Sequence, residues 1–375
     1  MVVALHGAYL PRMGPHNNRD GRVKGFIPSR ACHPEGLRAV LVGEDGYVVA
    51  ELDRPEPGPG EIVVRMLSCG LCGTDVEKLE GRYRGSKPVV GHEAAGVVAA
   101  LGEGVEGFRE GELVVPHHHV NCGSCYYCLR GSPTMCPSYR EYNFVPGGFS
   151  EYFSVPRWIV ERGGVHVPPP GLSAREACLA EPTACVLRAL RRIRFYEPSS
   201  YAVVGLGPMG LTFIQLARWA GAELVIGIDV NPARVSAAER YGAVGLLAGV
   251  EDDVAEVERL TGGRGVDAAF VAAGSPAALS RAISITRRGG VVCLFAVPPH
   301  GSSLSHDLSD LIVREVSIIS SNAATDREMA EALQLLANGV VDARSMITHT
   351  YSIGEFGRAL ETFKSGTGIK ILITP

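Results

Sequence analysis

The sequence predicts two domains of different class: an α/β domain built on a doubly wound parallel sheet, and a β-rich domain. Apolar strands and helices alternate between residues 201 and 297, which is the pattern of parallel strands joined by crossover helices. Short β-rich segments separated by glycine and proline turns run between residues 37 and 119, which is typical of a barrel-like region. A chain of 375 residues with 46% hydrophobic content is also long enough for two cores.

The β-rich half is expected to follow an extension. Residues 1–36 are rich in Gly, Pro, Arg and Asn and have little periodicity, so we interpret them as flexible or as the product of an upstream start codon. The strands expected after this extension cover residues 37–42, 47–52, 61–70, 96–101 and 112–119.

The chain changes character near residue 173. Ser173, followed three residues later by Glu176, forms a capping box that predicts a helix start. Pro182 suits the first turn of a second helix, which would place Glu181 near that helix's N-terminus, where the dipole favours a carboxylate. The arginines that follow are interpreted as a solvated helix face, with a phosphate or subunit contact as the alternative: Arg188, Arg191, Arg192 and Arg194.

A glycine-rich turn opens the α/β region. Gly205, Gly207 and Gly210 form G-x-G-x-x-G between an expected strand and helix, which favours binding of a dinucleotide pyrophosphate. Asp229 closes the second strand, where its carboxylate can accept hydrogen bonds from the adenosine ribose. A 2′-phosphate would be repelled there, so NAD is favoured over NADP, although Arg234 could tolerate a phosphate.

Four cysteines occupy one short run, "CGSCYYCLRGSPTMC", at Cys122, Cys125, Cys128 and Cys136. A ferredoxin run would separate the last two by three residues, and here seven lie between them. A redox pair would need only two cysteines, at a helix start near a βαβ unit. Four sulfur ligands leave no open coordination position, so the run predicts a closed, structural zinc site rather than a reaction centre.

Cys72, His92 and Glu93 lie on either side of a Gly-rich turn region, in "SCGLCGTDVEKLEG" and "VVGHEAAGVV". A thiolate, an imidazole and a carboxylate suit a catalytic zinc, which uses three protein ligands and keeps one position open. Alone, "GHE" is a weak signal, because a histidine in an apolar stretch is more often a hydrogen-bonded core residue.

Six motifs together, in order and spacing, resemble the zinc-containing medium-chain alcohol dehydrogenases: "CGTD", "GHEAAG", the four-cysteine run, "AEPTACVLRAL", "GLGPMG" and "GIKILITP". The resemblance covers Leu37 to Pro375 and is greatest to the threonine, polyol and sugar dehydrogenase branch, since Glu181 stands where the classical alcohol dehydrogenases have a cysteine. It implies a GroES-like catalytic domain, residues 37–185 and 323–375, with a structural-zinc lobe, and a Rossmann domain, residues 186–322.

The resemblance also implies roles for single residues. Cys72 and His92 would bind the catalytic zinc, with Glu181 as a third ligand or as a carboxylate that reaches the metal through water. Glu93 could also ligate the metal, in exchange with water or substrate. Asp75 would orient the site by hydrogen bonds. Thr74 would hold the substrate hydroxyl, and Glu77 stands where many relatives have a proton-accepting histidine. The softer expectations are Ala296 and Val297 at the nicotinamide carboxamide and Lys370 near the pyrophosphate.

These expectations describe an enzyme with two zinc ions per chain that transfers a hydride between a secondary alcohol and NAD(P). The substrate would be a polyol, a sugar or an amino alcohol such as threonine, with a simple alcohol as the alternative. An iron–sulfur or non-catalytic zinc protein is the rival outside enzymes. The net charge of −4, without a long basic run, predicts no nucleic-acid partner, and the glycine-interrupted apolar segments predict no membrane span. We expect a cytoplasmic protein and, from the resemblance, a homotetramer or homodimer.

Overall fold

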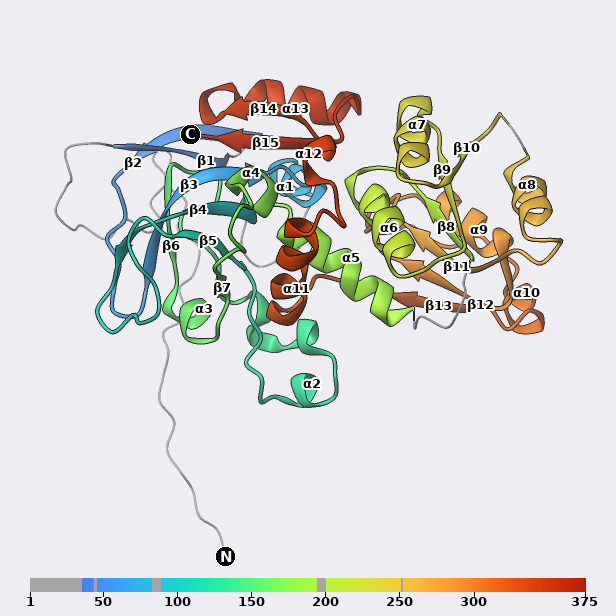
Figure 1. Cartoon of the computed structure of the whole chain (residues 1–375), viewed down its shortest axis with the longest axis horizontal. Coiled ribbons are helices and arrows are strands. Elements are labelled where there is room, and N and C mark those ends of the chain that lie inside the picture. Colours follow the sequence, from blue (N-terminus) through green and yellow to red (C-terminus); the bar gives the residue numbers. More distant parts are fainter. Residues whose placement is uncertain (1–35, 44–45, 83–88, 194–199, 251) are drawn as a thin grey trace, which may run out of the picture.

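The computed structural model describes residues 36–43, 46–82, 89–193, 200–250 and 252–375. Figure 1 shows a β-rich body on one side and an α/β body on the other, with helices α5 (Ala180–Arg192) and α11 (Asp326–Ala337) between them. The extension predicted for residues 1–36 lies outside the described residues except for Gly36. No helix in the described part of the chain is long and apolar enough to cross a membrane.

The β-rich body is built on a seven-stranded sheet. Its path is β14-β15-β3-β4-β5-β7, with β6 pairing to β3. The strands are β3 (Ile62–Gly70), β4 (Glu93–Leu101), β5 (Leu113–Pro116), β6 (Tyr152–Val155), β7 (Val165–His166), β14 (Ile347–Ser352) and β15 (Lys370–Thr374). A separate hairpin pairs β1 (Leu37–Gly43) with β2 (Gly46–Leu52). Because β15 pairs antiparallel with β3, the end of the chain returns to this body.

One predicted strand of this body is too long. The expected strand over 112–119 ends at Pro116, and His117 to His119 continue as a loop. Proline has no N–H to donate to a strand ladder, so it suits the end of the strand. The other predicted strands are present, and β4 begins three residues earlier than expected.

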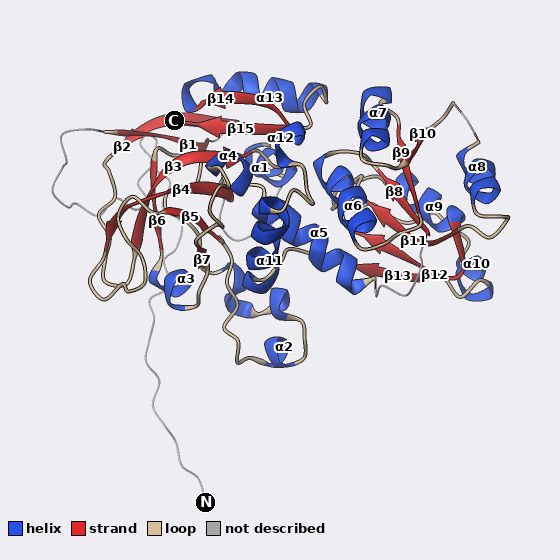
Figure 2. Ribbon diagram, in the orientation of Figure 1, coloured by secondary structure: helices blue, strands red, loops and turns tan. Residues whose placement is uncertain are grey.

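Short helices complete the β-rich body (Figure 2). They are α1 (Gly73–Leu79), α2 (Tyr126–Leu129), α3 (Arg157–Glu161), α4 (Ala174–Ala177) and α13 (Phe356–Ser365), with the 3-10 turns η1 (Pro133–Met135), η2 (Pro137–Arg140) and η3 (Ile353–Glu355). Its core includes Met66, Phe149, Phe153 and Phe356, all fully buried.

The α/β body confirms the predicted doubly wound parallel sheet. Its strand order is β10-β9-β8-β11-β12-β13, and every pairing is parallel. The strands are β8 (Ser200–Val204), β9 (Leu224–Asp229), β10 (Val244–Leu247), β11 (Val266–Val271), β12 (Thr286–Leu294) and β13 (Ser317–Ser320). The helices are α6 (Pro208–Trp219), α7 (Pro232–Arg240), α8 (Asp253–Leu260), α9 (Pro276–Ile285) and α10 (Leu308–Val313). The order reverses between β8 and β11, and ligands of such sheets bind beyond the carboxyl ends of the strands at that point.

Helix α5 joins the two bodies. It begins at Ala180 with Pro182 in its first turn, as predicted, and the capping box of Ser173 and Glu176 starts α4. Its solvated arginine face is only partly confirmed: Arg191 and Arg192 are exposed, but Arg188 is 8% exposed and donates from Nη1 to Ser321 Oγ at 3.4 Å. Arg194 lies outside the described residues. The helix α12 (Ala343–Met346) then leads to β14.

Candidate active site and metal centres

The glycine loop lies between β8 and α6, at the point where the strand order reverses. Gly205 has φ +98°, and a Cβ there would lie 2.8 Å from the Ala273 nitrogen. At Gly210 a Cβ would lie 2.0 Å from the Gly205 carbonyl oxygen, so only glycine lets the helix approach the strand. Gly207 precedes α6, and a Cβ there meets no atom within 4 Å. This geometry fits a pyrophosphate against the helix N-terminus.

Asp229 ends β9 and holds the loop in place. Its Oδ2 accepts a hydrogen bond from the Leu206 N–H at 2.6 Å, and its Oδ1 accepts one from the Asn231 N–H at 2.8 Å. The carboxylate therefore lies directly beside the glycine loop, and its contact with the adenosine ribose stays a prediction. Arg234, on α7, donates from Nη2 to the Gly366 carbonyl at 3.4 Å, so it is already partly engaged by the other body.

The segment expected to line the nicotinamide, Ala296 and Val297, lies after β12. The Ala296 N–H donates to the Val271 carbonyl at 3.0 Å, so it is not free to bind a carboxamide, and the expectation for Ala296 narrows to its carbonyl oxygen. The Val297 side chain is 69% exposed. The contacts of both residues with the nicotinamide stay predictions.

Cys72, His92 and Glu93 are brought together by the pairing of β3 with β4. Cys72 follows β3 and precedes α1, whereas Glu93 is the first residue of β4 and lies opposite Gly70. One ligand atom of each residue lies within 4.8 Å of the others. His92 is 7% exposed and Glu93 is 1% exposed. A sulfur, a ring nitrogen and a carboxylate oxygen at this separation, in a buried position, fit a catalytic zinc.

Asp75 orients this cluster. Its fully buried carboxylate accepts hydrogen bonds from the Gly91 N–H at 3.0 Å and the Cys72 N–H at 3.1 Å, and its Oδ1 lies 3.1 Å from His92 Nδ1. Burial would raise the pKa of Asp75, but the adjacent His92 lowers it. An ionised carboxylate on Nδ1 leaves the other ring nitrogen of His92 for a metal, which is the usual arrangement of zinc-ligating histidines.

Glu93 is paired with Lys370. The Lys370 ammonium on β15 contacts Glu93 Oε2 and also donates to the Leu71 carbonyl at 3.3 Å. Burial raises the pKa of Glu93, and the lysine opposes that shift; burial lowers the pKa of Lys370, but Glu93 raises it above its usual value. Lys370 is thus a partner of the metal cluster in this structure, and its predicted contact with the pyrophosphate stays a prediction.

The remaining candidates lie around the same cluster. Glu181 is 8% exposed in the first turn of α5 and accepts a hydrogen bond from the Cys185 thiol at 3.3 Å, but it does not belong to the compact group of three. Thr74 and Glu77 are partly exposed on α1, one and four residues after its start. The geometry leaves Glu181 as an outer carboxylate of the site, and the roles of Thr74 and Glu77 stay predictions.

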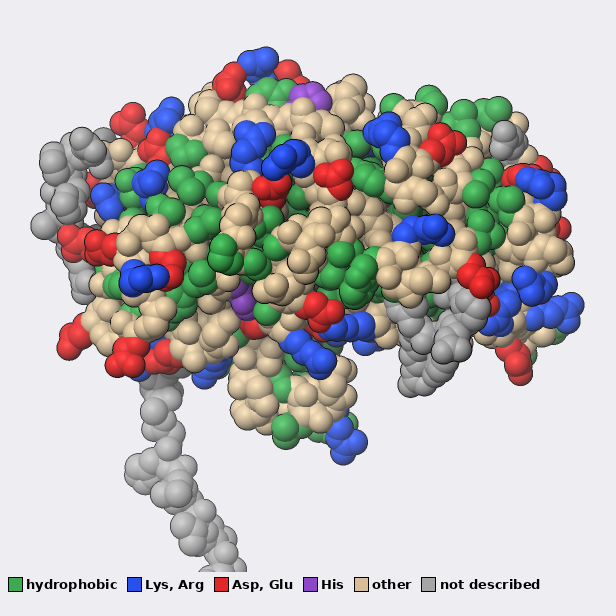
Figure 3. Space-filling view, viewed as in Figure 1, with side chains coloured by type: hydrophobic (Ala, Val, Ile, Leu, Met, Phe, Trp, Pro, Cys, Tyr) green, Lys and Arg blue, Asp and Glu red, His purple; other side chains and the backbone are tan. Residues whose placement is uncertain are grey.

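The four cysteines of the run form a second group, in a lobe that projects from the β-rich body (Figures 1 and 3). One sulfur atom of each lies within 4.8 Å of the others. Backbone N–H groups point at the sulfurs: Cys125 N donates to Cys122 Sγ at 3.3 Å and Cys122 N to Cys136 Sγ at 3.4 Å. Four sulfurs with these donors fit a closed zinc site.

The histidines after β5 lie near the Cys72 cluster, although the sequence pattern did not predict them as site residues. His118 is 5% exposed, and its ring centroid lies 5.0 Å from that of His92 and 3.7 Å from that of His119. His119 in turn lies 5.2 Å from the ring of Tyr139. The three consecutive histidines are visible in the sequence as "PHHHV". They were predicted to be part of a strand, whereas in the structure they lie in a loop that brings the His118 ring close to His92.

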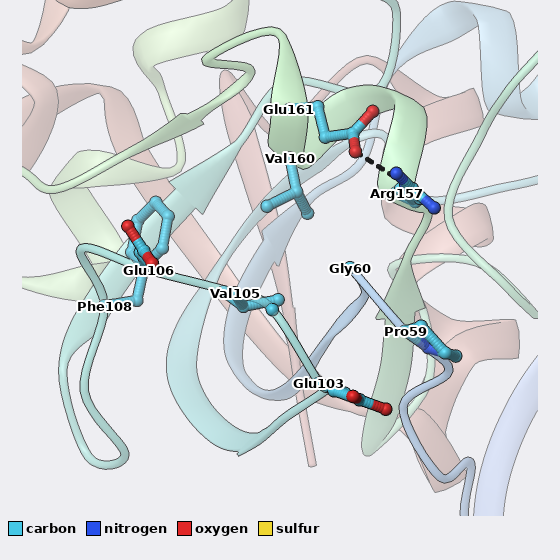
Figure 4. A pocket seen from close by; sticks show the side chains of 10 residues that line it. Pro59, Gly60, Glu103, Val105, Glu106, Phe108, Arg157, Val160 and Glu161 are labelled. Atoms are coloured by element: carbon cyan, nitrogen blue, oxygen red, sulfur yellow. Dashed lines mark hydrogen bonds and ion pairs between the residues drawn. The ribbon is translucent and has the colours of Figure 1, made fainter.

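A surface pocket of about 450 Å³ lies elsewhere on the β-rich body (Figure 4). Glu103, Glu106 and Glu161 line it, together with Arg157, which is paired with Glu161 at 2.6 Å. It shares no residue with the metal groups or the glycine loop, so we assign it no part in the chemistry.

Comparison with known proteins agrees with this arrangement. Residues 58–163 match the alcohol dehydrogenase GroES-like domain and residues 208–338 match the zinc-binding dehydrogenase domain. A sorbitol dehydrogenase of Halalkalibacterium halodurans is 32% identical over 89% of this chain and 97% of its own length. The chain belongs to the zinc-binding alcohol dehydrogenase family. The resemblance read from the six motifs is therefore confirmed.

Other relatives widen the comparison. An L-threonine 3-dehydrogenase of Pyrococcus horikoshii is 30% identical over 90% of this chain and 98% of its own length. A zinc-binding dehydrogenase of Sinorhizobium meliloti, solved with NADP bound, superimposes with a TM-score of 0.81 at 28% identity, covering 91% of this chain and 100% of the other. Members of this family thus include enzymes named for a polyol and for an amino alcohol.

Proposed function

We propose that the protein is a zinc-dependent oxidoreductase that transfers a hydride between a secondary alcohol and NAD(P), and that its substrate is a polyol, a sugar or an amino alcohol. The observation that carries this proposal is the buried group of Cys72, His92 and Glu93 in a chain that also carries the glycine loop and Asp229. The relatives named for sorbitol and threonine support the substrate class.

The residues of the site have distinct tasks in this reaction. Cys72 and His92 would hold a zinc ion, which when bound supplies a Lewis acid that lowers the pKa of an alcohol. Asp75 keeps His92 in the orientation that a ligand needs. Glu181 and Glu93 add negative charge beside the cluster, and Lys370 offsets that of Glu93. Thr74, two residues after Cys72, would hold the substrate hydroxyl, because a hydroxyl both accepts and donates.

The proton and the hydride leave in different directions. Gly205, Gly207, Gly210 and Asp229 would hold the dinucleotide, which when bound supplies the acceptor for the hydride of the carbinol carbon and would leave a carbonyl product. The hydroxyl proton passes through Thr74 toward solvent, either to Glu77 or directly to water. Neither path requires a movement of the four-cysteine lobe. We assign that lobe the role of holding a structural zinc ion.

NAD is the proposed cofactor because of Asp229. Its carboxylate lies where a 2′-phosphate would meet negative charge, and Arg234 is bonded to Gly366 instead of being free beside it. Replacing the charge in Asp229→Ser should shift the preference toward NADP by about tenfold, equivalent to about 1.4 kcal/mol. An unchanged ratio of kcat/KM for the two cofactors would contradict this assignment.

The test of the proposed function is a substrate panel with a metal count. Sorbitol, threonine, 2,3-butanediol and 2-butanol would each be supplied with NAD and with NADP, and bound zinc would be measured in the same preparation. We expect two zinc ions per chain, NAD reduction with at least one polyhydroxylated or amino alcohol, and a colourless protein. Two zinc ions without any turnover would leave a zinc-binding protein of another function. Light scattering of the same sample tests the proposed homodimer or homotetramer.

A further inference from the structure

The loop after β5 places an imidazole beside the catalytic cluster that no step above uses. The His118 ring lies against those of His92 and His119, tilted by 48° and 42°, and only 5% of the residue is exposed. Its neighbour His117 also has a buried, unpartnered Nε2, but His117 Nδ1 lies 3.0 Å from Asp326 Oδ1 and is fixed by that pair. His118 is thus the member of the loop that faces the cluster without a bonded partner.

The ring of His118 makes no hydrogen bond through either nitrogen among the described residues, and its Nδ1 is fully buried without a partner. A buried polar atom left in this state destabilises the fold, so such atoms are rare away from sites that receive a ligand or water. Because His118 lies next to the candidate metal ligand His92, the expected partner of its free ring nitrogen is the bound substrate.

The hydrogen-bonding groups of the ring narrow the partner further. A neutral imidazole offers one donor and one acceptor, and a hydroxyl group can pair with either, because it both donates and accepts. An ionised carboxylate only accepts, so the ring matches a hydroxyl group better.

We propose that His118 is a specificity-determining residue that binds a second hydroxyl of the substrate, on the carbon next to the one that is oxidised. This inference rests on the proposed function and deepens it. His118 is the neighbour of a metal-ligand imidazole, so it reaches the atom beside the reacting centre and leaves the reacting hydroxyl to the cluster. The site then selects a vicinal diol, such as a polyol, over a simple secondary alcohol.

A matched pair of substrates tests this selection. 2,3-Butanediol and 2-butanol differ by the hydroxyl on the adjacent carbon. We expect wild type to favour the diol by at least about tenfold in kcat/KM, because a site that hydrogen-bonds a hydroxyl rejects the analogue that lacks it. The ratio should fall to within about threefold in His118→Phe, which retains the ring volume and removes the polar atoms, and should recover in part in His118→Gln.

Two measurements separate specificity from damage. The zinc content and melting temperature of each variant show whether the cluster and the fold survive the change. His349→Phe is the matched control, because His349 lies on the edge strand β14, bonded to Thr348 rather than facing the cluster, and it should leave the substrate ratio unchanged. A ratio that is unchanged in folded, zinc-loaded His118→Phe overturns the inference.

A binding readout separates this inference from the proposed function. In the presence of NADH, the diol should raise the melting temperature of wild type more than 2-butanol does, and His118→Phe should abolish that difference. If wild type shows the shift but no turnover with any alcohol, the proposed function fails and the hydroxyl site stands. If the panel establishes turnover but the diol gives wild type neither a preference nor a shift, the inference fails and the dehydrogenase stands.

Discussion

The four-cysteine lobe and the Cys72 cluster are both able to hold zinc, but they are surrounded in opposite ways. The lobe offers sulfur only, is partly exposed, and carries exposed Tyr126 and Leu129 on its short helix. The Cys72 cluster offers three different donor atoms, is buried except at the partly exposed Cys72, and is backed by the Asp75 carboxylate and the Glu93–Lys370 pair. The richer run of cysteines therefore makes the chemically simpler site. Charge and hydrogen bonds around the ligands, and not the number of sulfurs, are what distinguish the proposed catalytic site from the proposed structural zinc site.

Removing one sulfur from each site gives the largest test of this contrast. Cys72→Ser and Cys125→Ser should each lower the zinc count from two ions per chain to one. Cys72→Ser should lower kcat by about 10³-fold, because Lewis-acid stabilisation is worth several kcal/mol. Cys125→Ser should lower the melting temperature. The activity of the folded Cys125→Ser protein should stay within about tenfold of wild type, because the lobe takes no part in the proposed reaction.

Metal analysis, calorimetry and steady-state rates on the two variants check this result. The comparison fails if folded Cys125→Ser loses as much activity as Cys72→Ser, or if Cys72→Ser keeps both its zinc and its rate.

The hydrogen bond between Asp75 and the candidate ligand His92 is the next difference to test. Asp75→Asn removes the charge that fixes His92, and we expect zinc affinity at the Cys72 cluster to fall by about 10–100-fold, measured by competition with a chelator. Asp326→Asn is the matched control, since Asp326 lies 3.0 Å from His117 Nδ1 and pairs with no candidate ligand in the described part of the chain. Equal affinities in wild type and Asp75→Asn would show that the hydrogen bond seen in the structure does not tune the metal.

Local sequence patterns were sufficient to predict much of the fold and part of the candidate site. The glycine loop, Asp229 and the four-cysteine run are each set by spacing within a few residues or within one βαβ unit, and each appears in the structure where it was expected. The candidate zinc ligands Cys72 and His92 are 20 positions apart, and their proposed role came from the resemblance and not from spacing.

The features that the sequence analysis missed depend on segments far apart in the chain. Lys370 meets Glu93 only because β15 joins β3. Arg188 is buried because Ser321 and Asn322 follow β13 and cover it, which a helical pattern of arginines cannot reveal. His118 and His119 leave the strand because Pro116 ends it. In each of these cases, contacts between distant segments determine the structure, and the local sequence pattern does not reveal them.

Thiol reactivity distinguishes the two regions once the metal is removed. In the free lobe, the backbone and then the hydroxyl of Ser124 lower the pKa of Cys122 to about 6, whereas burial raises the pKa of Cys128 to about 11. Because the thiolate is the nucleophile, Cys122 should be alkylated at least about tenfold faster than Cys128 at pH 7.5 after chelation. Burial raises the pKa of Cys178, behind the catalytic cluster, to about 12, so it should stay unmodified.

Mass spectrometry of peptides after timed exposure to iodoacetamide measures these rates. Added zinc should protect the lobe thiols, because thiolates that ligate a metal are no longer free to react. Equal rates at Cys122 and Cys128 would contradict the assigned pKa difference.

The smallest expected effect concerns Glu77, which has no counterpart in the lobe. Glu77 lies on α1, five residues after Cys72, and is partly exposed. If it accepts the substrate proton, Glu77→Gln should lower the oxidation rate by about tenfold, less than the 10²–10⁴ typical of a direct general base, because water can take the proton instead. The remaining activity should then rise more steeply with pH than in wild type, because the proton leaves to solvent without a carboxylate. A pH profile of kcat that keeps its wild-type shape and height would remove Glu77 from the mechanism and leave water as the acceptor.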